Sequence, residues 1–375
     1  MPEPRPLRIV VKALILFALA NLAFAYFNPT LSGLSIFNHV VKGRVRLPAQ
    51  RQQNDSFNQG ILSFQDMDEL FASHVIAIPK ASNEYRVILL GDSSIWGWTL
   101  SPSDILSEQI NRLNLTTCTG KTVRVYDLAY PFPSYLRDLL ILSQAVQYHP
   151  DLVIWPITLD TLLPTTSNFH ILVYQSGRIL QLQRMYGLMV PFADRLQDQE
   201  SSNNTIIGQR SKIKVEIVDQ FYGLLWGASG MDAEIPPPHP PVTDLPANLQ
   251  FKSEFGTYAS PYVSKKLIES IQFSALNAGI NLASNVPILF FNEPIYIANG
   301  QNSSIRYNTH YPRWAYDEYR SSIAGWMKEQ QLPYEDFWNA IAASEFADPE
   351  VHLTPQGEQL LAIKLTPGIL KMACK

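Results

Sequence analysis

The chain has 375 residues, of which 46% are hydrophobic and 17% are charged, which excludes a largely disordered protein and allows a full folded core. The net charge is −4, although seven Lys and Arg residues and only one acidic residue lie in the first 51 positions. The rest of the chain is therefore acidic, which argues against nucleic acid as a partner.

An apolar run covers residues 7–27. Of the first basic residues of the chain, Arg5 precedes this run, and Arg8 and Lys12 lie in its first turns. Its uncharged part, residues 13–27, is longer than many signal-peptide cores and shorter than the span of about 20 residues that a bilayer needs. A small-x-small sequence at 23–25 resembles a cleavage site, but the apolar character continues to Phe27, which favours an uncleaved anchor. We expect residues 1–27 to be a signal anchor or signal peptide, and the remainder to be exported and membrane-anchored.

Residues 28–84 contain no long periodic run, and we interpret them as a stalk or lead-in that partly docks on the next domain, with one short helix near 66–76. From residue 85 to 375 the pattern alternates between apolar strands and amphipathic helices. Strands are predicted at 85–91, 123–129, 151–157 and 286–292, and a short fifth strand or a turn is predicted at 332–338. Helices are predicted at 103–113, 134–148, 264–279 and 313–330, with a last helix starting near 354.

Strands that alternate with helices imply a mostly parallel sheet covered on both faces, in three α/β/α layers. Residues 161–260 interrupt this alternation, and we interpret them as a large insertion that covers or walls the site. Its proline run at 236–241 is expected to be an extended loop. Two cysteines, Cys118 and Cys374, form neither a disulfide framework nor a zinc motif, and the sequence leaves open whether they pair.

The first predicted strand ends abruptly at Gly91, Asp92, Ser93 and Ser94. A serine at the carboxyl end of a buried parallel strand faces the crevice where open α/β sheets bind ligands. Backbone N–H groups at such a turn point to where an oxyanion would be held. A Gly-Asp-Ser triplet is also common by chance, so the triplet alone is equally compatible with an ordinary strand-to-helix turn.

A histidine, His352, stands at the head of the last predicted helix, with Asp348 close before it. An imidazole can take the proton of a serine, and a carboxylate can hold the imidazole in its orientation. The other histidines, His310 among them, are expected to be structural.

With these motifs the chain resembles the SGNH (GDSL-type) hydrolase superfamily over roughly 85–160 and 285–368. Gly91-Asp92-Ser93 matches the nucleophile block, and the segment 352–357 (HLTPQG) matches the tail of the last block. The resemblance implies a flavodoxin-like α/β/α fold, with Ser93 as the nucleophile and His352 as the base. Ser94 is the first alternative nucleophile.

Three positions depart from the family pattern. Asp348 lies one residue further from His352 than usual, so Glu350 and Glu345 are alternative orienting acids. Ala129 occupies the slot of the glycine whose N–H joins the oxyanion hole. Asp160 occupies the slot of the asparagine donor.

An ionised aspartate accepts hydrogen bonds and cannot donate them. We therefore expect either that a protonated Asp160 donates to the oxyanion, or that it turns away and the hole is formed by the N–H groups of Ser93 and Ala129.

Glu293 follows the fourth predicted strand and is a candidate substrate-binding residue at the same crevice. The aromatic, Arg and Asn residues over 306–314 suit either a saccharide surface or a packed loop. The sequence contains no metal-binding cluster, phosphate-binding glycine loop or dinucleotide fingerprint, so no cofactor is expected.

These features predict an exported, membrane-tethered serine esterase or O-acyltransferase that acts on acyl esters, with cell-envelope glycans as candidate substrates through the resemblance. The alternative is a catalytically inactive binding or scaffold protein that retains the SGNH fold. The sequence does not decide the acyl group, the acceptor, or the oligomeric state.

Overall fold

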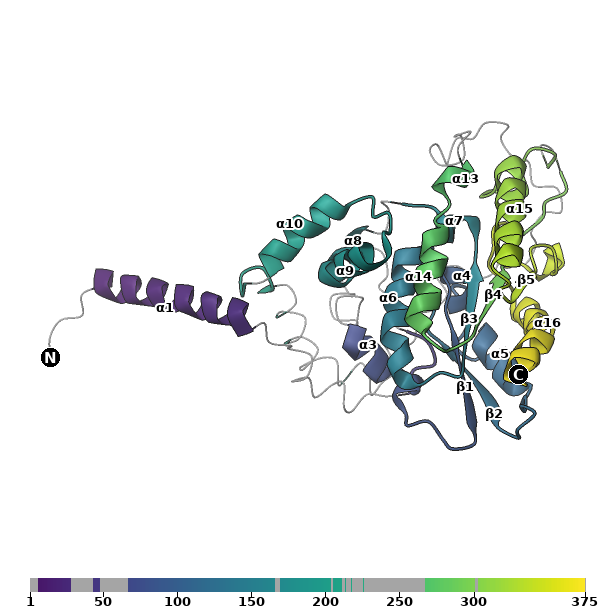
Figure 1. Cartoon of the computed structure of the whole chain (residues 1–375), viewed down its shortest axis with the longest axis horizontal. Coiled ribbons are helices and arrows are strands. Elements are labelled where there is room, and N and C mark those ends of the chain that lie inside the picture. Colours follow the sequence, from purple (N-terminus) through teal and green to yellow (C-terminus); the bar gives the residue numbers. More distant parts are fainter. Residues whose placement is uncertain are drawn as a thin grey trace.

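The structure is a computed structural model that describes residues 6–27, 43–47, 67–165, 169–203, 205–210, 213, 217, 225, 267–300 and 303–374. Helix α1 (Pro6–Phe27) has 22 residues, a mean hydropathy of 2.1 over its most apolar window and no buried residue (Figure 1). Its length and composition allow it to cross a membrane, as they also would for a signal sequence.

Five parallel strands form the sheet, in the order β2-β1-β3-β4-β5. The strands are β1 (Glu84–Leu89), β2 (Thr122–Asp127), β3 (Leu152–Ile157), β4 (Ile288–Asn292) and β5 (Tyr334–Asp336). Every residue of β3 and β4 is buried, as expected for central strands that are covered on both faces. This strand order is that of the flavodoxin-like fold, and the predicted fold class is therefore confirmed.

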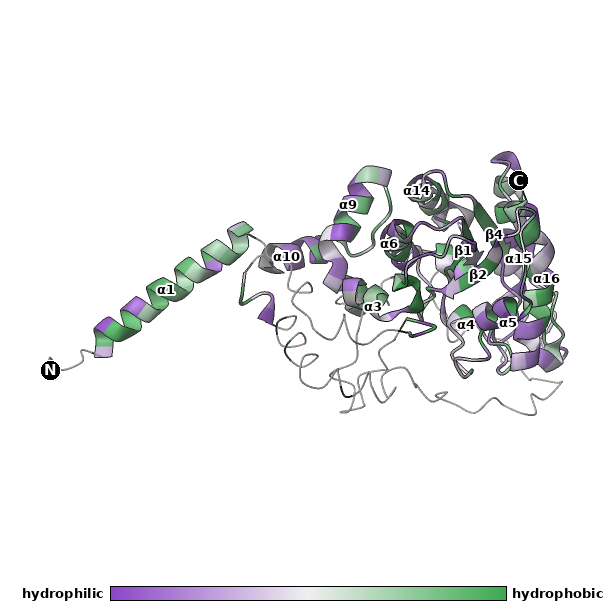
Figure 2. Ribbon diagram, turned by 90° about the horizontal axis from the view of Figure 1, so that it is seen from below, coloured by the Kyte–Doolittle hydropathy of each residue, from purple (hydrophilic) through white to green (hydrophobic). Residues whose placement is uncertain are grey.

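Helices cover both faces of the sheet. Figure 2 shows α6 and α14 on one side of the strands and α4 and α5 on the other. The helix α15 joins the first layer, where Trp326 stacks on Phe273 of α14, and α16 packs against α5. The main helices of the layers are α5 (Leu106–Arg112), α6 (Tyr135–Ala145), α14 (Phe273–Ala283), α15 (Arg313–Glu329) and α16 (Pro355–Ala373).

The other described helices lie in the connections. They are α3 (Met67–Ser73), η2 (Val75–Ala77), α4 (Ser93–Trp96), η3 (Val146–Tyr148), α7 (Leu159–Leu162), α8 (Phe169–Leu172), η4 (Val173–Gln175), α9 (Ser176–Tyr186), α10 (Ala193–Asn203), α13 (Leu267–Ser270) and η7 (Ala343–Glu345). The single helix predicted at 264–279 is instead α13 and α14, which are separated by a break before Phe273.

Part of the lead-in docks on the α/β domain. The guanidinium of Arg46 donates to the carbonyl oxygens of Trp96, Gly97 and Leu100, at 3.2, 3.0 and 3.3 Å. It also lies over the ring of Trp96, whose Nε1–H donates to the carbonyl oxygen of Leu47 at 2.6 Å. These contacts hold the short helix α4 from outside the domain.

The described part of the insertion packs beside α6. Tyr135 of α6 donates to the carbonyl oxygen of Met189, and Arg178 of α9 donates to Gln144 of α6 at 3.1 Å. The predicted proline loop at 236–241 lies outside the described residues.

A disulfide joins Cys118, between α5 and β2, to Cys374 at the end of α16, with Cα atoms 5.2 Å apart. The sequence left this pairing open, because the two cysteines are 256 positions apart. The bond ties the C-terminal helix to the edge of the sheet.

We predict that replacing both cysteines (Cys118→Ala with Cys374→Ala) lowers the free energy of unfolding by about 2–4 kcal/mol, because the unfolded chain gains a long unconstrained loop. Denaturant unfolding monitored by circular dichroism would measure this loss. Either single variant should lose a similar amount, since each removes the same bond. Two titratable thiols in the oxidised wild type would contradict the prediction.

Candidate active site

The turn after β1 presents Ser93 at the carboxyl end of the sheet. Gly91 has φ of +138°, and a Cβ at this position would lie 2.6 Å from the side chain of Ile95, so only glycine fits. Asp92 caps α4 by accepting the N–H of Ser94 at 2.9 Å. Ser93 is therefore the first residue of α4, directly above the end of a central strand.

His352 and Asp348 complete an array with this serine. The Nε2 atom of His352 lies 3.0 Å from Ser93 Oγ, and its Nδ1 atom is hydrogen-bonded to Asp348. The second oxygen of Asp348 accepts the backbone N–H groups of Glu350, Val351 and His352, at 2.9, 3.2 and 3.3 Å. These bonds wrap residues 350–352 around the Asp348 carboxylate. Asp348 therefore reaches the His352 ring although it lies one residue further from His352 than in the SGNH pattern.

The loop that carries the imidazole is pinned at both ends. The N–H of Ala347 donates to the carbonyl oxygen of His352 at 2.7 Å, and the N–H of Thr354 donates to that of Glu345 at 2.9 Å. Thr354 also caps α16 through the N–H of Gly357 at 3.1 Å. A Cβ at Gly357 would lie 2.5 Å from the Glu345 carbonyl oxygen, so this approach also requires glycine.

The two alternative acids have other partners. Glu350 accepts a hydrogen bond from Thr309 Oγ1 at 3.2 Å, and Glu345 accepts one from Thr354 Oγ1 at 3.2 Å. Among the acids considered from the sequence, Asp348 is the one bonded to the His352 ring.

The acid and the imidazole shift each other's pKa values. Burial alone would lower the pKa of His352, but the hydrogen bond and charge of Asp348, with the charge of Asp92, raise it on balance. Burial alone would raise the pKa of Asp348, but its bonds from His352 and from backbone N–H groups lower it on balance. The imidazole is therefore a stronger base than a free histidine.

We predict that Asp348→Asn lowers the pKa of His352, since it removes the negative charge that favours the imidazolium. Titration of the His352 ring signals by NMR would measure this. The surface variant Asp104→Asn, which is remote from the ring, should leave the titration unchanged. An unchanged or raised His352 pKa in Asp348→Asn would contradict the assignment of Asp348 as the orienting acid.

A cavity of about 80 Å³ opens beside Ser93. It is lined by Asp92, Ser93, Pro133, Thr158, Asp160, His310, Tyr311, Glu350, Val351 and His352. The insertion at 161–260 was expected to cover or wall the site. No described residue between 161 and 300 lines this cavity, and because much of the insertion lies outside the described residues, the expectation stays a prediction. The described helices of the insertion lie beside α6 instead.

Asp160 is in the cavity, but it is not placed as a free donor. Its carboxylate is hydrogen-bonded to Nε2 of His310. A carboxylate in contact with an imidazole favours the ion pair, in which Asp160 accepts and His310 donates. This contact gives Asp160 a partner that the sequence did not indicate, and its expected donation to an oxyanion stays a prediction.

The backbone donor expected from Ala129 has another partner. Its N–H donates to Asp127 Oδ1 at 2.8 Å, and Ala129 does not line the cavity. Asp127 is completely buried at the end of β2, and burial raises its pKa well above the usual range. The predicted contribution of Ala129 to an oxyanion hole is therefore not supported by this geometry.

Glu293 lies below the nucleophile turn and not in the cavity. It is 1% exposed and hydrogen-bonded to Ser94 Oγ, which in turn lies 3.0 Å from Asp92 Oδ1. Burial and the charge of Asp92 raise the pKa of Glu293 well above its usual range. Glu293 therefore supports the turn from beneath, contrary to its predicted role in substrate binding. Ser94, the alternative nucleophile, is engaged in this buried network.

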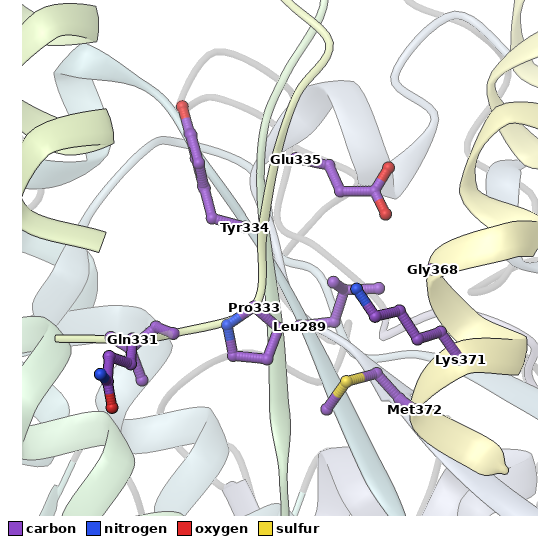
Figure 3. Close-up of a pocket in the computed structure, with 9 residues that line it drawn as sticks. Leu289, Gln331, Pro333, Tyr334, Glu335, Gly368, Lys371 and Met372 are labelled. Carbon is purple, nitrogen blue, oxygen red and sulfur yellow. The ribbon is translucent and has the colours of Figure 1, made fainter. Parts of the chain in front are cut away.

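A larger cavity, of about 230 Å³, lies at the opposite end of β4 and β5 (Figure 3). Lys371 of α16 points into it, and Glu335 of β5 lines it on the side of α16. No serine, threonine, cysteine or histidine is among its lining residues, and it is remote from Ser93 along the strands. Among the described residues, no group of three or more His, Cys, Asp or Glu side chains is arranged to hold a metal ion.

One site residue, His310, was expected to be structural. The only indication in the sequence was the density of polar and aromatic residues around it, over 306–314. No local pattern links this segment to Asp160, which is 150 positions away.

The fold and the array define the class of this chain: an α/β fold of the kind implied by the SGNH resemblance, with a serine, a histidine and an aspartate at the carboxyl ends of its strands. No protein-family model matches the sequence, and no curated protein matches it.

Solved structures give low-identity matches. One is a carbohydrate acetylesterase family member from Sinorhizobium meliloti, with 12% identity, a TM-score of 0.36, and coverage of 77% of this chain and 98% of that chain. An aryl esterase from M. smegmatis has 11% identity, a TM-score of 0.37, and coverage of 77% and 99%. An acetylxylan esterase from Geobacillus stearothermophilus has 13% identity, a TM-score of 0.34, and coverage of 77% and 94%.

Proposed function

We propose that this protein is a serine enzyme that transfers acyl groups from esters, either to water or to another hydroxyl. The observation that carries the proposal is the chain of contacts from Ser93 Oγ through the His352 ring to Asp348. A serine becomes a nucleophile when a base is within hydrogen-bond reach and a third group orients that base.

In the first half of the reaction, Ser93 Oγ attacks the ester carbonyl carbon while His352 Nε2 takes the hydroxyl proton. Asp348 stabilises the imidazolium that forms. When the tetrahedral intermediate collapses, His352 returns the proton to the leaving alcohol, and the acyl group remains as an ester on Ser93.

In the second half, a hydroxyl compound attacks the acyl-enzyme and His352 takes its proton. The intermediate then collapses, Ser93 leaves with a proton from His352, and the acyl group departs on the attacking oxygen. Water gives hydrolysis, and a sugar hydroxyl gives O-acyl transfer. The cavity of about 80 Å³ is far smaller than the roughly 300–1,000 Å³ of pockets for drug-sized ligands, which favours a short acyl group.

We further propose that the enzyme is exported, held at a membrane by α1, and directed to acyl esters of cell-envelope glycans. The apolar helix supports the anchor, and the disulfide Cys118–Cys374 supports an oxidising compartment. The glycan substrate rests on the SGNH resemblance together with this location.

We predict that Ser93→Ala lowers kcat for hydrolysis of p-nitrophenyl acetate by about 1,000-fold or more, since the covalent route is lost. His352→Ala should give a comparable loss. A fluorophosphonate probe should label the wild type at Ser93 and leave Ser93→Ala unlabelled.

Ser143→Ala is a matched control, because this serine lies on α6 and donates only to the carbonyl oxygen of Leu140. It should keep full activity and labelling. Full activity in Ser93→Ala would refute the assignment. A wild type that neither turns over the ester nor reacts with the probe would favour the inactive scaffold.

The location can be tested separately. We predict that the full-length protein stays with the membrane fraction after a carbonate wash, because α1 is inserted in the bilayer. A truncated variant that starts at residue 28 should be released from the membrane fraction by the same wash. Full-length wild-type protein in the soluble cytoplasm would refute anchoring, and a shortened released form would indicate cleavage instead.

A further inference from the structure

A second acid–imidazole pair shares the cavity with the Ser93 array. Asp160, in the first turn of α7 at the end of β3, is hydrogen-bonded to Nε2 of His310. His310 comes from a different segment, between β4 and α15. Both residues line the same cavity as Ser93 and His352.

The segment before His310 is built as a rigid support. Asn308 is 0% exposed, and its Oδ1 accepts the N–H groups of His310 and Tyr311 at 2.8 and 2.7 Å. Arg306 is 5% exposed and donates to the carbonyl oxygens of Asn308 and Thr309, at 3.1 and 2.7 Å. Buried polar side chains that bind their own loop fix its backbone, and this backbone carries His310.

This support is also bonded to the loop that carries His352. Asn308 Nδ2 donates to the carbonyl oxygen of Glu350 at 3.1 Å. Thr309 Oγ1 donates to the carbonyl oxygen of Pro349 at 3.1 Å. The two imidazoles are therefore held by loops that are fixed to each other, and both line one small cavity.

The surroundings of His310 favour its cationic form. Burial alone would lower the pKa of His310, but the charges of Asp160, Glu350 and Asp92 raise it on balance. These acids come from α7, from the loop before α16 and from the turn after β1. His352 is the other titratable imidazole that lines the cavity.

We propose that His310, held as an imidazolium by Asp160, stabilises the oxyanion that forms when Ser93 attacks the ester carbonyl. This inference rests on the proposed function and adds a residue to it. Asp160 stands in the slot where the SGNH pattern has an asparagine donor. In this protein the donor is His310, which comes from another loop and is bound by Asp160.

The charge balance of the step is simple. As the Ser93 Oγ–carbon bond forms, the carbonyl oxygen gains a negative charge and the proton of Ser93 moves to His352. His310 keeps its own proton and faces the new charge as a cation. The interaction grows only as the transition state forms, so its loss should lower kcat and leave KM nearly unchanged.

The pH dependence has a definite sign. His352 works as a base only when neutral, so activity rises as pH increases through its pKa. His310 works only when charged, so activity falls as pH increases through its own pKa. The profile of kcat/KM is then bell-shaped, and on this proposal the alkaline limb, which is the decline at high pH, comes from deprotonation of His310.

The test uses His310→Ala, His310→Gln and Asp160→Asn in the full chain, with p-nitrophenyl acetate as substrate. His310→Ala should lower kcat by about 100- to 1,000-fold, as for other lost oxyanion donors. His310→Gln should lose the alkaline limb, because its amide does not titrate. Asp160→Asn should move that limb to lower pH, since the imidazolium loses its counter-charge.

The matched control is His149→Gln, at an exposed histidine after η3, which should keep the wild-type profile. A wild type with activity and Ser93 labelling whose His310 variants keep the same kcat and profile would overturn this inference alone. Variants that raise KM without lowering kcat would also overturn it, and would indicate ground-state binding. A wild type with no activity and no labelling refutes the proposed function as well.

Discussion

The hydrogen bond between His352 and Ser93 joins residues 259 positions apart, and the rest of the site depends on it. It can form because the carboxyl ends of parallel strands meet at one edge of the sheet. β1 delivers the serine to this edge, and β5 leads to the loop that holds the imidazole. The same edge receives Pro133 after β2, α7 after β3 and the His310 loop after β4, so the connections after all five strands converge on one cavity.

The turn that carries Ser93 is supported from two sides. From below, Glu293 and Asp92 hold Ser94, whose buried hydroxyl is hydrogen-bonded to both carboxyl groups. From outside, Arg46 of the lead-in binds the carbonyl oxygens at the end of α4. The disulfide at Cys374 fixes the far end of the helix that follows His352. Thus elements remote from the chemistry restrict the motion of both partners in the array.

The sequence by itself determined the parts of this protein that depend on local chemistry. The apolar run of β3 predicted a buried strand, and Thr354 with Pro355 predicted the start of the last helix. Gly91 predicted a tight turn, because its positive φ is available to glycine alone. Ser93 and His352 could be selected for the same reason: each stands at a junction whose local sequence specifies the end of a strand or the start of a helix.

The tertiary structure alone decided which distant groups meet. The N–H of Ala129 donates to Asp127, and Glu293 is buried against Ser94. Asp160 is hydrogen-bonded to His310. None of these contacts can be predicted from the spacing of the residues in the sequence. Periodicity reports which face of an element is buried, but it does not report which side chain from another connection lies opposite. Pairing of polar groups across a cavity depends on how the strand ends and loops converge, and only the folded chain specifies that convergence.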